Sequence, residues 1–81
     1  MSERLQYLGR LREKELQAKE LGLKIKGLID SLRLKLDPFE KIEELETALI
    51  AQQSMELATV HIEYIGITEE IKALKKALGK V

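Results

Sequence analysis

The 81-residue chain contains no cysteine, no tryptophan, one proline and one histidine, and only 4% of its residues are aromatic. Without cysteine it can form no disulfide and no thiolate metal site, and a single histidine does not suffice for the usual zinc site. The sequence has no apolar run near the roughly 18 residues of a membrane span, and none follows its first four residues as in a signal peptide. We therefore expect a cytoplasmic protein with no membrane partner, no metal and no cofactor.

Net charge is also lacking, because 14 Lys and Arg balance 14 Asp and Glu. A polyanion-binding protein that relies on bulk charge would carry an excess of basic residues, so nucleic acid is not the expected partner. Residues 1–37 hold nine basic and six acidic residues, whereas residues 38–81 hold five basic and eight acidic ones. The two parts are electrostatically matched, as expected for segments that pack side by side.

Catalytic motifs are missing as well. Ser31 and Ser54 lie in helical patterns outside any Gly-rich elbow, and the chain has no Gly-rich phosphate loop. His61 lacks the Glu-x-x-His spacing of metal sites in helical bundles, which favours a structural or solvent-facing histidine. The sequence predicts that this chain is not an enzyme.

The dipeptide Asp37-Pro38 divides the chain into two helical patterns. Proline disfavours helical geometry at the preceding residue and is well placed at the first position of a helix, which Asp37 would cap. We expect one all-α domain over residues 1–81, an antiparallel two-helix hairpin with a helix over 3–35, a turn over 36–38 and a helix over 39–78. Ser2 would cap the first helix, and Gly79 would end the second.

Such a short turn would pair the two helices so that Leu32 faces Ile42 and Tyr7 faces Ile67. A rival interpretation concerns residues 59–68, which are rich in β-branched residues and contain Gly66. They would then form a strand or break the second helix. We favour a continuous helix, because an isolated strand would have no partner and the apolar spacing of three and four residues continues through this segment.

Each predicted helix carries apolar residues on two opposite faces, whereas a lone hairpin can bury only one face of each helix. The outer face of the first helix is sparse, with Leu5, Leu16, Leu23 and Leu34. The outer face of the second is denser and repeats every three or four residues, as in a coiled-coil seam. Its members are Ala48, Ala51, Met55, Ala58, Ile62 and Ile65.

These patterns predict a protein–protein interaction module, a small oligomerising adaptor, scaffold or chaperone-like hairpin. We expect two copies to form a coiled-coil-like four-helix bundle through the dense outer face, with a different helical protein as the alternative partner. The alternative function is a nucleic-acid-binding or regulatory bundle that uses the basic open end of the hairpin. That candidate anion patch consists of Arg10, Arg12, Lys72, Lys75 and Lys76.

Overall fold

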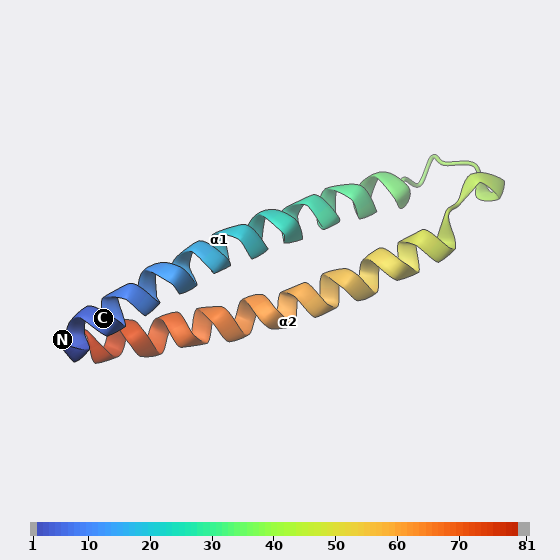
Figure 1. The fold of residues 1–81 in the computed structure, drawn as a ribbon. Helices are drawn as coiled ribbons and strands as arrows, with labels where there is room; N and C mark the ends of the chain where they lie inside the picture. The colour runs from blue at the N-terminus through green and yellow to red at the C-terminus, as the bar shows by residue number, and fades with distance from the viewer. Residues whose placement is uncertain (1, 80–81) are drawn as a thin grey trace.

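The computed structural model describes residues 2–79 and consists of two long helices packed side by side (Figure 1). Helix α1 spans Glu3–Lys35, and helix α2 spans Thr47–Ala77. A single-turn 3₁₀ helix, η1 (Ile42–Glu44), lies in the connection between them. The helices run antiparallel, and the part of the chain that the structure describes contains no strand. The protein is a rod with principal extents of 62 × 17 × 14 Å.

Helix α1 begins and ends where the sequence predicts. The Ser2 hydroxyl accepts a hydrogen bond from the backbone N–H of Arg4 at 3.2 Å, so it caps the helix. Arg33 and Lys35 lie in the last turn, where positive charge is favourable next to the carbonyl end of the helix dipole. At the end of α2, Gly79 adopts a positive φ of 71°, as predicted for its terminator.

The start of α2 differs from the expected one at about residue 39. Asp37 does not cap α2; its carboxylate accepts a hydrogen bond from the backbone N–H of Phe39 at 3.0 Å and closes a local turn after α1. The predicted turn over 36–38 is therefore too short, because the connection extends over residues 36–46 and α2 begins only at Thr47. Ile42, expected to face Leu32, is 83% exposed, and Phe39 in the same connection is 93% exposed.

The physical reason lies in the residues that would continue the seam. Core positions of α2 alternate by three and four residues back to Ile50, and the next two positions in this series are Glu46 and Glu43. Extending the helix would carry these carboxylates into seam positions beyond the end of α1, where no partner helix is present and charged side chains bring no apolar burial to stabilise further turns. The helix therefore begins one residue after Glu46.

The hydrophobic seam follows one heptad pattern in both helices and leaves few side chains fully covered. The most deeply buried residues are Leu11, Leu28, Leu32, Val60 and Leu78. Residues 59–68 are helical throughout, so the predicted continuity of this segment is confirmed. No described side chain falls below 2% exposure, which is a consequence of packing only two helices.

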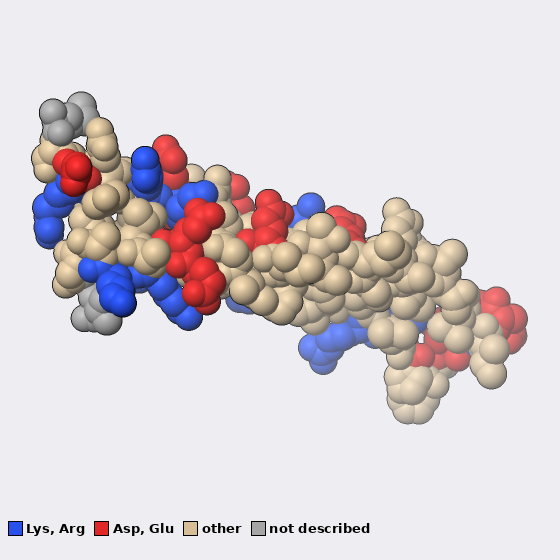
Figure 2. All heavy atoms as spheres, turned by 90° about the horizontal axis from the view of Figure 1, so that it is seen from below, with Lys and Arg blue, Asp and Glu red and all other residues tan. Residues whose placement is uncertain are grey.

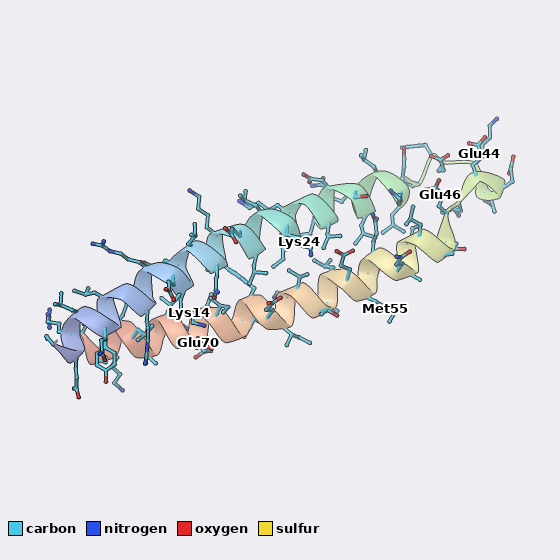
Figure 3. The ribbon with its side chains drawn as sticks, in the orientation of Figure 1. Lys14, Lys24, Glu44, Glu46, Met55 and Glu70 are labelled. Atoms are coloured by element: carbon cyan, nitrogen blue, oxygen red, sulfur yellow. The ribbon has the colours of Figure 1, made fainter. Side chains whose placement is uncertain are left out.

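Polar contacts across the seam set the register. Lys14 Nζ lies 2.8 Å from Glu70 Oε2 toward the open end of the hairpin (Figure 3). Near the closed end, the Ser31 hydroxyl donates to Gln53 Oε1 at 3.1 Å. Within α1, Lys35 Nζ donates to the same Ser31 hydroxyl, also at 3.1 Å. The Lys14–Glu70 and Ser31–Gln53 pairs show that α2 is displaced along α1 relative to the expected register. The predicted pairing of Leu32 with the exposed Ile42 is therefore wrong.

Gln53 lies in the seam at a position that an apolar residue would fill. We expect Gln53→Leu to raise the free energy of unfolding by about 1 kcal/mol, because polar seam residues fix register at a cost in stability. Urea unfolding followed by circular dichroism measures the change, with the exposed Gln6→Leu as control. A stability loss specific to Gln53→Leu would show instead that its bond to Ser31 outweighs the cost of burying the amide.

Candidate interaction surface

The six residues of the predicted interface lie on the outer face of α2 and are all exposed. We call this set, Ala48, Ala51, Met55, Ala58, Ile62 and Ile65, the outer seam. Met55 and Ile62 are each 72% exposed, and the Met55 side chain points away from α1 (Figure 3). Helix α1 thus leaves the outer seam uncovered.

The surface around the outer seam carries almost no charge. Between Thr47 and Thr68 the only acidic residues are Glu56 and Glu63, and there is no Lys or Arg. Glu56 is directed toward α1, where its Oε1 lies 3.5 Å from Lys24 Nζ. Figure 2, which views the rod from the α2 side, shows the result as a broad uncharged band between charged ends. An uncharged apolar band of this kind is typical of a protein–protein interface.

A shallow groove between the helices extends this band toward α1. Its volume is about 420 Å³, and Ala58 belongs to both the groove and the outer seam. The lining residues are Ile25, Ile29, Ser54, Leu57, Ala58 and His61. Sequence reasoning missed this groove. Uncharged residues beside the two core stripes, Ile29 in α1 and Ser54 and His61 in α2, are its signal in the sequence, but only the correct register of the two helices brings them together.

The hairpin exposes far more surface than a compact protein of its mass. Its solvent-accessible area is 6498 Å², whereas a compact monomer of 9.3 kDa exposes about 5,000 Å². The excess of about 1,500 Å² exceeds the roughly 800 Å² that each partner contributes to a standard interface. The exposed surface of the hairpin is therefore large enough to bind a partner without separation of the two helices.

The outer face of α1 is also exposed but discontinuous. Leu16 and Leu23 are separated from Leu34 by Asp30, and basic residues lie alongside them. These leucines do not form a run of three-and-four spacing like that of the outer seam. Scattered exposed leucines are common on protein surfaces, so we assign no site to this face.

The structure brings the residues of the predicted anion patch to the open end, where the start of α1 lies beside the end of α2 (Figure 1). Arg10, Arg12, Lys72 and Lys76 are exposed, and Lys75 is half-buried. Acidic residues are interleaved with them, as the mixed colours at this end of Figure 2 show. Lys72 Nζ lies 3.5 Å from Glu69 Oε1 in the same helix. This mixture weakens the patch as a site for phosphate groups.

The closed end is strongly acidic. The connection over residues 36–46 contains Asp37, Glu40, Glu43, Glu44 and Glu46 but only one basic residue, Lys41. A side-chain hydrogen bond with Glu44, together with the negative charges of its neighbours, raises the pKa of the Glu40 carboxyl above its ordinary value. The crowding of these carboxylates makes the closed end favourable for a cationic neighbour.

Within residues 2–79, no group of three His, Asp or Glu residues is arranged to hold a metal ion. Neither helix of this part of the chain is long and apolar enough to cross a membrane.

The functional inference below rests on the geometry of the hairpin and not on similarity to known proteins. No protein-family model, curated protein or solved structure matches the chain.

Proposed function

We propose that the protein is a non-catalytic protein–protein interaction module that assembles with itself through the outer seam. The observation that carries this proposal is the uncovered, uncharged apolar face of α2. Three large side chains, Met55, Ile62 and Ile65, lie on this face, and each would contribute roughly 1.5–3 kcal/mol when fully buried. Exposing them permanently to water would forgo this stabilisation, whereas a second copy would bury them on both chains.

In the proposed assembly two hairpins form a four-helix arrangement, with the two α2 helices in contact and the two α1 helices outside. Such a homodimer would serve as a small adaptor or scaffold in the cytoplasm and leave the ends of both rods accessible. The alternative is that a different helical protein binds the outer seam. A measurement of the oligomeric state of the purified protein distinguishes this alternative from self-association.

Sedimentation equilibrium over a hundredfold range of protein concentration tests this proposal. We expect the weight-average mass to rise from one chain toward two across this range. Thermal unfolding should shift to higher temperature as concentration increases, since association stabilises only the folded hairpin. A folded hairpin that remains monomeric at every concentration would refute self-association and leave the outer seam to another protein.

A further inference from the structure

We infer that the second copy lies antiparallel to the first, with the two α2 helices related by a two-fold axis that passes between Met55 and Ala58. This inference rests on the proposed self-association and adds its geometry. In this arrangement each residue of the outer seam faces a residue of the partner's outer seam. The two facing residues lie at equal distances from the two-fold axis, on opposite sides of it along the helix. Its support comes from side-chain size, from the flanking residues and from the charges at the two ends.

Side-chain size differs between the two halves of the outer seam. Its first half begins with Ala48 and Ala51, and its second half ends with Ile62 and Ile65. In an antiparallel pair, Ala48 faces the partner's Ile65, and Ala51 faces the partner's Ile62. Met55 likewise faces the partner's Ala58. Every layer then combines one small and one large side chain, so the spacing between the helices stays even along the seam.

A parallel pair would combine like with like in every layer. Ala48 would face the partner's Ala48, and Ile62 would face the partner's Ile62. The helices would then be held apart at the isoleucine layers, and the alanine layers would lose their van der Waals contacts. The alternation of sizes therefore favours the antiparallel direction.

The flanking positions allow the same close approach. In the antiparallel pair, Ser54 lies near the partner's His61, and Gln52 lies near the partner's Thr59. These four exposed side chains can donate or accept hydrogen bonds, and none carries a fixed charge. The flanks consequently create no like-charge contact across the axis.

The ends of the rod provide the electrostatic argument. Along α2, the outer seam continues beyond Ile65 into Glu69, Lys72 and Lys76, while before Ala48 the chain enters the acidic closed end. An antiparallel pair brings the closed end of each hairpin alongside the last part of the partner's α2, where Lys72, Lys75 and Lys76 outnumber Glu69 and Glu70. A parallel pair would instead place two acidic closed ends together, where like charges repel.

Because the chain lacks cysteine, a single spin label can measure the direction. Ala73 is exposed on α2, beyond the six residues of the outer seam, so Ala73→Cys places the label outside the apolar layers of the proposed contact. At 1.5 Å per residue along each helix, the antiparallel pair separates the two labels by roughly 50 Å. The parallel pair would hold them within about 25 Å, since packed helix axes lie 8–10 Å apart.

Double electron–electron resonance on the labelled dimer distinguishes the outcomes. A distance near 50 Å is the expected result. A short distance in a protein that sedimentation shows to be dimeric would overturn the antiparallel inference and leave self-association standing. A labelled protein that shows no dipolar coupling and sediments as a monomer, like the unlabelled chain, would overturn both.

A charge reversal provides an independent test. We expect the pair Lys72→Glu and Lys76→Glu to weaken the dimer about tenfold or more at low salt, because these residues would then face an acidic closed end. Adding Glu43→Lys and Glu44→Lys to the same chain should restore most of the affinity. Absence of any rescue in a folded protein would contradict the end-to-end charge pairing.

Discussion

Replacing Ile62 with glutamate is expected to raise the dissociation constant of the dimer by at least a hundredfold. By symmetry each dimer contains two copies of residue 62, so it loses the burial of two isoleucines, about 3 kcal/mol or more in total. It also places two carboxylates in an apolar interface without partners. Since a factor of ten corresponds to 1.4 kcal/mol, the hundredfold figure is a lower bound. Sedimentation equilibrium of the variant beside the natural sequence measures this change.

The hairpin itself should survive this substitution, because Ile62 is 72% exposed on the outer face of α2. The far-ultraviolet circular dichroism of Ile62→Glu is therefore expected to stay helical. Leu16→Glu is the matched control, since it adds the same charge to an exposed leucine on the outer face of α1. Equal weakening by both variants would show that the outer seam is not the specific contact.

Replacing Leu32 with alanine is expected to lower the free energy of unfolding by about 2–3 kcal/mol. Leu32 is 7% exposed and packs in the seam, so truncation removes transfer free energy and leaves a cavity. For a chain whose total stability is typically about 5–15 kcal/mol, this is a large fraction. Urea unfolding of both proteins at the same protein concentration measures the difference. The concentration must be the same because association shifts the unfolding midpoint of an associating protein.

Leu34→Ala provides the comparison, two residues further along the same helix. Leu34 is 77% exposed, so the same chemical change there should alter stability by less than about 0.5 kcal/mol. If Leu34→Ala instead proved as costly as Leu32→Ala, the outer face of α1 would have to be buried in the assembled protein. The pair thus also tests the assignment of α2 as the contacting helix.

The sequence was sufficient to predict two helices packed side by side, all of α1 and the end of α2, because local signals there agree with the periodic pattern. Ser2 caps α1, and Gly79 ends α2 at the positive φ that glycine favours. The connection was mispredicted because Pro38 was interpreted as a helix start. The stronger signal was the position of Glu43 and Glu46 in the three-and-four series, which determines where a buried seam must end.

The predicted register of the two helices was wrong for the same reason, because it depended on the length of the connection. A short turn at Pro38 would align Leu32 with Ile42, whereas the longer connection lets Ser31 meet Gln53 and Lys14 meet Glu70. The exposure of the outer seam was foreseeable, because a heptad series fixes which positions face away from the partner helix. The groove beside Ala58 was not predicted, because it requires residues of both helices to be placed in the correct register.

The 62 Å length of the rod has a mechanical consequence. In an antiparallel pair the two open ends point in opposite directions, so molecules attached to them would be held on opposite sides of the assembly. Residues near Lys75 of the two copies would then stand roughly 55 Å apart, given 1.5 Å per helical residue. The pair would act as a rigid spacer that holds two attached molecules at a fixed separation, whereas a parallel pair would hold them side by side.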